Sequence, residues 1–203
     1  MNEKLSSGIL VGRPFGGVAI LYKIDLSNHI KIIDCDCDRY VAIQLYIKYI
    51  CNFVIHCVYF PCNSNCPDYI VDASNIISKI ELNFNNYSSS SHLLAGDFNF
   101  VCADGIAGYD LFKSIIPNYG LTCCDNLNTS NVNYTYCHAT LNQSSLLDHF
   151  FVSDNVKQSI VNYEIIDSGI NLSDHLPVSC TLSIISFVAN NDLNQIKKIY
   201  RDR

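Results

Sequence analysis

The segment from Ile50 to Phe60 limits most strongly what this chain can fold into. It is apolar almost throughout, is rich in β-branched and aromatic residues, and ends at Pro61. A run of this length and composition predicts a central strand that is buried on both faces. The rest of the chain must therefore cover both sides of that strand.

Short apolar runs recur along the chain and predict further strands. These runs lie at 17–22, 40–47, 92–96, 134–137, 146–152, 161–166 and 177–185. Apolar residues at helical spacing predict a helix from Pro67-Asp68 to about Phe84, and residues 109–116 predict a shorter helix. Many strands with few helices favour an α/β sandwich, although other α+β layouts share this pattern.

Composition narrows the class of protein. The 203 residues suit one domain, and 49% hydrophobic with 16% charged residues is typical of a globular chain. The sequence has neither an apolar run of membrane-spanning length nor a signal pattern at its start, so we expect an intracellular protein, nuclear or cytoplasmic, without a membrane partner. The net charge of -6 argues against tight non-specific binding of nucleic acid, but it is compatible with carboxylates gathered around a metal ion.

The chain contains eleven cysteines, which is an unusual number. Several lie inside apolar runs, where a reduced cysteine packs as a small hydrophobic residue: Cys51, Cys57, Cys102 and Cys180. Neither the Cys35/Cys37 pair nor the Cys123/Cys124 pair has the spacing of a zinc knuckle, and no matching Cys/His pair follows at a useful distance. We therefore expect reduced thiols, since only the number of cysteines supports a metal or redox role.

Three polar motifs stand at the ends of predicted strands, where loops on a rigid sheet often carry catalytic groups. In Gly96-Asp97-Phe98-Asn99, the carboxylate and the carboxamide point the same way if the segment stays extended. Such a pair suits the orientation of a water beside a metal ion or a phosphate. An ordinary Asx turn explains the same residues, and alone the motif favours that simpler interpretation.

The second motif, Ser173-Asp174-His175-Leu176-Pro177, leads into the last strong strand, and alone it favours a capped turn with a surface histidine. In the third motif, Asp148 interrupts the apolar strand 146–152. A buried carboxylate needs a partner, and an imidazole is suitable because the carboxylate fixes its tautomer and favours its charged form. The next residue, His149, would face the opposite side of the strand, so we predict that it is not catalytic.

Four motifs follow one another along the chain: Val58-Tyr59-Phe60-Pro61, Gly96-Asp97-Phe98-Asn99, Leu147-Asp148-His149-Phe150 and Ser173-Asp174-His175-Leu176-Pro177. Their order resembles that of the endonuclease/exonuclease/phosphatase superfamily, which has the DNase I-like fold. Upstream, Gly12-Arg13-Pro14-Phe15-Gly16-Gly17-Val18-Ala19-Ile20-Leu21 resembles a strand of the endonuclease domains of non-LTR (LINE-type) retrotransposons. Each motif is weakly specific alone, but together they are strong, and they cover roughly Gly12 to Leu182.

The resemblance implies a four-layered α/β sandwich with its site at one edge of the two sheets. It also implies hydrolysis of a DNA phosphodiester by an activated water, with Mg²⁺ or Mn²⁺ as the cofactor. In this scheme Asp174 belongs to the metal shell, and Tyr59 lends its hydroxyl to the phosphate.

The remaining roles that the resemblance implies concern the water and the scissile phosphate. Asp97 would orient and activate the water, and Asn99 would help to hold the water and the phosphate. His175 would contact the phosphate and stabilise the charge that builds on it, while Asp148 would orient that imidazole.

The resemblance also implies a segment that this sequence does not match. Family members begin with a strand that carries a metal-site asparagine, followed by a helix and a second strand that ends in a metal-binding glutamate. Here only sixteen residues precede Gly17, and neither Asn2 nor Glu3 has an apolar strand around it. We therefore expect a family-type domain over residues 1–185 that lacks this first strand-helix-strand segment, and a tail or linker over residues 186–203.

A domain without that segment would have unpaired strand edges and too few oxygen ligands for a hard cation. We therefore expect a weakly held metal ion, marginal stability, and weak or no activity. Cooperative thermal unfolding together with metal-dependent turnover would contradict this expectation. A parent protein that also carries a reverse transcriptase would explain such a fragment.

Other functions remain open on the sequence alone. An inactive remnant or a binding module of the same fold would be indifferent to a chelator, whereas an enzyme would lose its activity. A superfamily phosphatase acting on phosphoinositides or sphingolipids is a further possibility, but the start Gly12-Arg13-Pro14-Phe15-Gly16-Gly17 favours the retrotransposon branch. Residues 134–136 and the loop 126–133 are candidates to line a substrate groove, although aromatic residues on a strand more often belong to a core.

Overall fold

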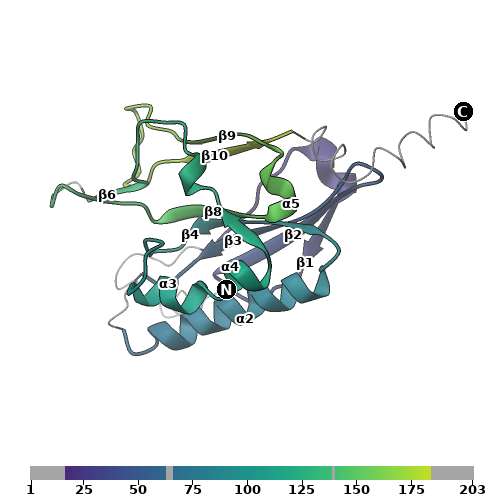
Figure 1. Cartoon of the computed structure of the whole chain (residues 1–203), viewed down its shortest axis with the longest axis horizontal. Coiled ribbons are helices and arrows are strands. Elements are labelled where there is room, and N and C mark those ends of the chain that lie inside the picture. The colour runs from purple at the N-terminus through teal and green to yellow at the C-terminus, as the bar shows by residue number, and fades with distance from the viewer. Residues whose placement is uncertain (1–16, 63–65, 139, 184–203) are drawn as a thin grey trace, which may run out of the picture.

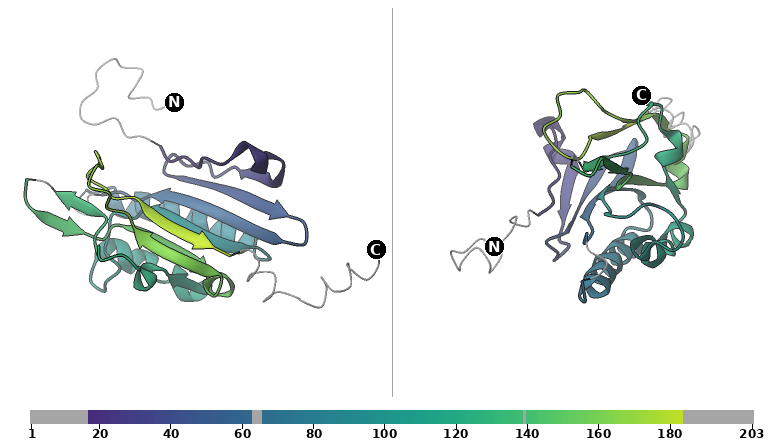
Figure 2. Two further views of the ribbon diagram at one scale, coloured as in Figure 1. Left: turned by 90° about the horizontal axis from the view of Figure 1, so that it is seen from above. Right: turned by 90° about the vertical axis from the view of Figure 1, so that its left-hand side faces the viewer.

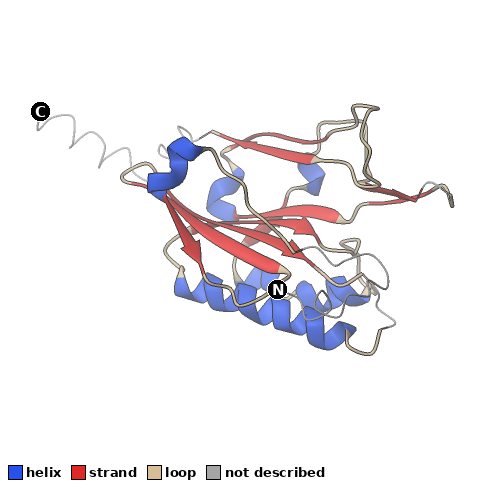
Figure 3. Cartoon of the chain, turned by 180° about the vertical axis from the view of Figure 1, so that it is seen from behind, coloured by secondary structure: helices blue, strands red, loops and turns tan. Residues whose placement is uncertain are grey.

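The computed structural model describes residues 17–62, 66–138 and 140–183. In these ranges a six-stranded mixed sheet has helices on one face and a two-stranded sheet on the other (Figure 1). Viewed from behind, the helices again lie along one side of the large sheet (Figure 3). This architecture confirms the expected α/β fold. The fourth layer that the resemblance implies is not among the described residues.

The large sheet has the strand order β1-β2-β3-β4-β8-β5. Its strands are β1 (Ile30–Ile33), β2 (Tyr40–Ile47), β3 (Cys51–Tyr59), β4 (Ser91–Asp97), β5 (Leu121–Cys123) and β8 (Asp148–Ser153). The smaller sheets are β9 (Ile160–Ile165) with β10 (Val178–Leu182), and β6 (Tyr136–His138) with β7 (Gln143–Ser145). The β6–β7 hairpin extends from one end of the molecule (Figure 2).

The described helices are more numerous than the sequence predicts, and all except α2 are short. They are η1 (Ile24–His29), α2 (Tyr69–Asn86), α3 (Ala107–Phe112), α4 (Ile115–Asn118), η2 (Asp125–Leu127) and α5 (Asp154–Lys157). The helix predicted at 109–116 is thus divided into α3 and α4. No described helix is long and apolar enough to cross a membrane.

Strand β3 is the central element that the apolar run predicts. It pairs antiparallel with β2 and parallel with β4. Val54 and Val58 lie in the core between the large sheet and the helices, whereas Phe53 lies in the core between the two sheets. The expected burial of this strand on both faces is confirmed.

Helix α2 connects the parallel strands β3 and β4, as a parallel connection requires. It buries Ala73, Ile76, Ile80 and Phe84 at helical spacing, and all of them belong to the core beneath the large sheet. The predicted start at Pro67-Asp68 and end near Phe84 agree with the observed bounds within two residues.

The predicted strand at residues 17–22 is wrong. These residues are irregular, and Leu21 and Tyr22 are 95% and 43% exposed. A strand is held by the hydrogen bonds of a neighbour, and among the described residues the edge strand β1 pairs with β2 and with no other strand. Residues 12–16 of the same motif and the predicted tail at 186–203 lie outside the described residues.

Gly96 permits an unusually close approach between β3 and β4. It pairs with Val58, and its φ of +144° is rarely adopted by residues with a side chain. A Cβ atom at this position would lie 2.0 Å from the Val58 carbonyl oxygen. Because that contact is with backbone, the two strands would have to separate just before Asp97.

We predict that Gly96→Ala destabilises the protein by about 3 kcal/mol or more, because the added methyl group clashes with backbone and strains φ. Urea unfolding followed by circular dichroism measures this change. Gly105→Ala is the matched control, since Gly105 also has a positive φ (+84°) but a Cβ there meets no atom within 4 Å. Equal losses in the two variants would contradict the steric explanation.

Candidate active site

Three inner strands of the large sheet, β3, β4 and β8, bring polar residues together at one end of the sheet. Tyr59 ends β3 and pairs with Asp97, which ends β4. Asp97 in turn pairs with Asp148, which begins β8. Asp148 is therefore the first residue of its strand, and not an interruption within it as the sequence suggests. Its half-buried carboxylate lies at the end of the strand, where a ligand can reach it.

The Asp148 carboxylate holds the imidazole of His175. The Nδ1–H of His175 donates to Asp148 Oδ2 at 2.8 Å. Backbone contacts place both residues: the Thr135 hydroxyl accepts from the Asp148 amide at 3.0 Å, and His175 bridges to Tyr136. The Tyr136 ring lies 5.0 Å from the imidazole, centroid to centroid. The carboxylate–imidazole pair expected from the sequence is thus present.

Asp97 faces the other nitrogen of the same imidazole. His175 Nε2 lies 4.0 Å from Asp97 Oδ2. Asn99, which has a φ of +51°, folds back so that its backbone N–H donates to Asp97 Oδ1 at 2.9 Å. Its side-chain amide donates to Asp97 Oδ2 at 3.1 Å and to the Phe60 carbonyl at 3.0 Å. The Asx turn that the sequence allowed is therefore formed, and it fixes the carboxylate of Asp97.

The surroundings shift the protonation of both groups. Burial and the nearby charge of Asp148 raise the pKa of Asp97 to about 6. The hydrogen bond to Asp148 raises the pKa of His175, and the charges of Asp148, Asp97 and Asp174 act in the same direction. The site therefore combines an imidazole whose charged form is favoured with a carboxylate whose pKa is raised to about 6.

Besides Asn99, two of the predicted residues, Tyr59 and Asp174, lie outside the group that could hold a metal ion. The cluster that could hold a metal ion consists of Asp97, Asp148 and His175, and the exposed Asp174 is not part of it. Tyr59 is half-buried, and the Arg39 guanidinium lies 5.0 Å from its ring centroid. Magnesium is commonly held by one or two carboxylates, waters and substrate phosphate, so the donors present fit such an ion.

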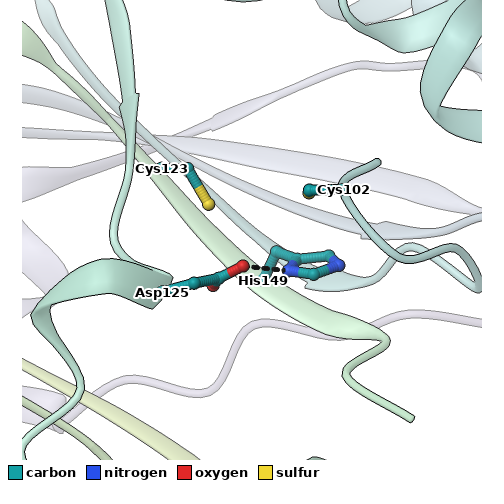
Figure 4. Close-up of side chains that lie close together, drawn as sticks. All are labelled: Cys102, Cys123, Asp125 and His149. Carbon is teal, nitrogen blue, oxygen red and sulfur yellow. Dashed lines mark hydrogen bonds and ion pairs between the residues drawn. The ribbon is translucent and has the colours of Figure 1, made fainter. Parts of the chain in front are cut away.

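A second cluster was missed by the sequence reasoning. Cys102, Cys123, Asp125 and His149 bring their side chains together on the helix-facing side of β8 (Figure 4). His149 faces away from Asp148, as expected, but it is not isolated, because its Nδ1–H donates to Asp125 Oδ2 at 2.7 Å. Burial lowers the pKa of His149, but the hydrogen bonds and charges of Asp125 and Cys102 together outweigh burial and raise it to about 10. No fixed spacing in the sequence indicates this cluster.

The sequence matches the model of the Endonuclease/Exonuclease/phosphatase family over residues 7–175. The chain therefore belongs to this family, whose fold serves both nucleases and phosphatases. No curated protein sequence is significantly similar to it.

Solved structures show the same fold at low sequence identity. The endonuclease domain of TRAS1, a telomere-specific non-LTR retrotransposon, has a TM-score of 0.59 and 13% identity over 78% of this chain and 69% of that chain. The 3' phosphatase NExo from Neisseria, bound to a product DNA hairpin, has a TM-score of 0.57, with 16% identity over 72% and 65% of the two chains. An AP endonuclease from Archaeoglobus fulgidus has a TM-score of 0.57, with 12% identity over 72% and 65%.

We predict that Asp97→Asn stabilises the metal-free protein at alkaline pH. Because the pKa of Asp97 is raised from 3.8 to about 6 in the folded protein, protonation of Asp97 stabilises the fold. This stabilisation is complete below pH 3.8 and is lost as the pH rises through about 6. Ionised Asp97 then costs about 3 kcal/mol, and the variant forgoes one hydrogen bond of about 1 kcal/mol. The expected gain is about 2 kcal/mol near pH 8 and close to none near pH 4.

Thermal or urea unfolding at the two pH values, in the presence of a chelator, measures this gain. Asp167→Asn is the control, because Asp167 is an exposed carboxylate in a turn. A variant that is no more stable than the original protein at the higher pH would contradict the argument from burial.

Proposed function

We propose that this chain is a Mg²⁺- or Mn²⁺-dependent phosphodiesterase of the DNA endonuclease type. The observation that carries the proposal is the imidazole of His175, whose two nitrogens face two carboxylates, Asp148 at 2.8 Å and Asp97 at 4.0 Å. An oxygen atom at about 2.8 Å from both Nε2 and Asp97 fits between these two groups. A phosphate oxygen or a water at that position would meet an acid and a base.

In this proposal His175 binds the scissile phosphate. Asp148 accepts the Nδ1–H, which keeps the ring oriented and protonated, so that Nε2–H points away from Asp148 and toward the phosphate. The positive charge stabilises the negative charge that builds on the phosphate in the transition state. Asp148 is thus a positioning residue, and His175 is the group that touches the substrate.

Asp97 is the proposed base for the attacking water. A pKa of about 6 leaves the carboxylate ionised at neutral pH, yet it keeps the affinity for a proton that a general base needs. Asn99 holds this carboxylate through two hydrogen bonds, and its amide oxygen is left to contact the water or the phosphate. Asn99 therefore acts both on the base and on the substrate.

Tyr59, Tyr136 and Asp174 complete the proposed site. The hydroxyl of Tyr59 donates to the phosphate, while Tyr136, beside His175, lines the groove for DNA. Asp174 would help to hold the metal ion through its exposed carboxylate. When bound, the metal ion neutralises charge on the phosphate and lowers the pKa of water. With so few oxygen ligands, we expect weak metal binding and low activity.

The choice of DNA as the substrate is supported by the similar structures of DNA-acting proteins, including a retrotransposon endonuclease domain. A parent protein that carries a reverse transcriptase agrees with that choice. A nuclear or cytoplasmic location agrees with the eleven free cysteines, because thiols stay reduced in those compartments. One second candidate has specific support: removal of a 3' phosphate from DNA, because a 3' phosphatase shares the fold.

The test is nicking of supercoiled plasmid by the purified chain with Mg²⁺ or Mn²⁺. We expect slow nicking that a chelator abolishes, a roughly 100-fold or greater loss in His175→Ala and Asp97→Asn, and a loss of roughly 10- to 100-fold in Asp148→Asn. His29→Ala is the control, because His29 is exposed on η1 away from these strand ends. A DNA hairpin with a 3' phosphate, assayed in parallel, measures the phosphatase activity.

The outcomes separate the candidates. Nicking that survives in His175→Ala or in the presence of a chelator would contradict the proposed mechanism. Release of phosphate from the hairpin without nicking would favour the 3' phosphatase. A folded chain that does neither, but still binds DNA in the presence of a chelator, would be a binding module of the same fold.

A further inference from the structure

The second cluster lies on the face of β8 that is turned away from the candidate active site. Cys102 follows β4, Cys123 ends β5, Asp125 begins η2 and His149 lies in β8; these four residues are called the β8 thiol cluster. Their ligand atoms all lie within 4.8 Å of one another (Figure 4). Three regions that are distant in the chain thus converge on one point, because Cys123 and Asp125 are close neighbours in the sequence.

The imidazole of His149 is held by partners on both nitrogens. Nδ1 faces Asp125 Oδ2 at 2.7 Å, and Nε2–H donates to the carbonyl oxygen of Phe100 at 2.8 Å. A metal-binding histidine usually donates its other N–H to a carbonyl or a carboxylate, which fixes the ring and its tautomer. The Phe100 carbonyl performs this function here and leaves Nδ1 directed into the cluster.

Asp125 is oriented in a comparable way. Its Oδ1 atom accepts a hydrogen bond from the Tyr163 hydroxyl at 3.2 Å, while Oδ2 points to the imidazole. Carboxylates that bind metal ions are themselves commonly held by such hydrogen bonds. Two of the four donors therefore have the outer partners that a metal site needs before any ion binds.

The donor types indicate which ion the cluster would take. Two thiolates, one imidazole and one carboxylate are four ligands of the kind that zinc binds in a tetrahedron. Neighbouring ligand atoms around zinc are about 3.5 Å apart, so small side-chain rotations would bring this cluster to that geometry. Magnesium prefers oxygen ligands, so it would favour the carboxylates of the candidate active site over this cluster.

Burial also suits a closed structural site. His149 is 1% exposed, and the two cysteines and Asp125 are half-buried. The ring of Phe98 packs 5.6 Å from the imidazole, so one side of the cluster is apolar. A hydrogen-bonded His–Asp pair beside two reduced thiols that holds no ion would show no thiolate-to-cobalt absorption, which separates it from a metal site.

We propose that the β8 thiol cluster binds one zinc ion through four protein ligands. Binding displaces the protons of the two thiols and of Nδ1, so that two thiolates, one carboxylate and a neutral imidazole surround the ion. The ion would fasten β8 to β5, to η2 and to the segment after β4. Since β8 also begins with Asp148, the zinc ion would stabilise the strand that orients His175.

The test uses the reduced, full chain in which the exposed Cys62 and Cys66 are replaced by serine, so that they cannot bind metal. We expect the chain to bind one equivalent of Zn²⁺, or one of Co²⁺ in its place. The cobalt form should show thiolate-to-cobalt charge-transfer absorption, and zinc should raise the midpoint of thermal unfolding. Cys123→Ser should weaken binding by roughly 100-fold or more. Cys57→Ser, which replaces a half-buried cysteine of β3, is the matched control and should bind normally.

A second measurement covers the case in which the cysteine variants do not fold. X-ray absorption of the zinc-loaded original protein should show two sulfur and two nitrogen or oxygen neighbours. No charge-transfer absorption from the folded chain, unchanged binding in Cys123→Ser, or a zinc ion with no sulfur or four sulfur neighbours would overturn the proposal. None of these readouts depends on nuclease activity.

Discussion

The antiparallel register between β4 and β8 is the constraint on which both clusters depend. It pairs Asp97 with Asp148 and, one residue away, Gly96 with His149. Successive residues of a strand face opposite sides, so a slip of one residue would exchange the directions of Asp148 and His149. The carboxylate would then lose the imidazole of His175, and the thiols would face a carboxylate in place of a histidine. On the other side of β4, the lack of a side chain at Gly96 lets β3 approach closely.

Local periodicity was sufficient to predict β2, β3, β4 and α2, because their apolar patterns are long and regular. The order of the motifs was sufficient to predict that Asp97, Asp148 and His175 come together, although their roles remain proposals. Residues 17–22 could not be assigned correctly, since a strand-like pattern becomes a strand only where a neighbour supplies hydrogen bonds. The β8 thiol cluster could not be predicted either, because Cys102 and Asp125 lie in irregular or one-turn segments whose spacing follows from the tertiary structure.

The two carboxylates of the candidate active site have separate environments although they pair across the sheet. Asp148 accepts one short hydrogen bond from the imidazole of His175. Asp97 accepts the hydrogen bonds of Asn99 and lies 4.0 Å from the imidazole, while burial and the charge of Asp148 oppose its ionisation. In the proposed function, this asymmetry suits one carboxylate to orienting the imidazole and the other to exchanging a proton.

The connectivity of the large sheet also has a consequence for how the molecule folds. Strands β1 to β4 and helix α2 are consecutive in the chain, and their contacts close short loops. Strand β8 joins β4 only after a long intervening segment, so this contact carries a larger loss of chain entropy and is expected to form late. An intermediate built from the first half would contain Asp97 but neither Asp148 nor His175 in place. Assembly of the candidate active site during refolding would therefore lag behind recovery of secondary structure, because it needs the second half of the chain.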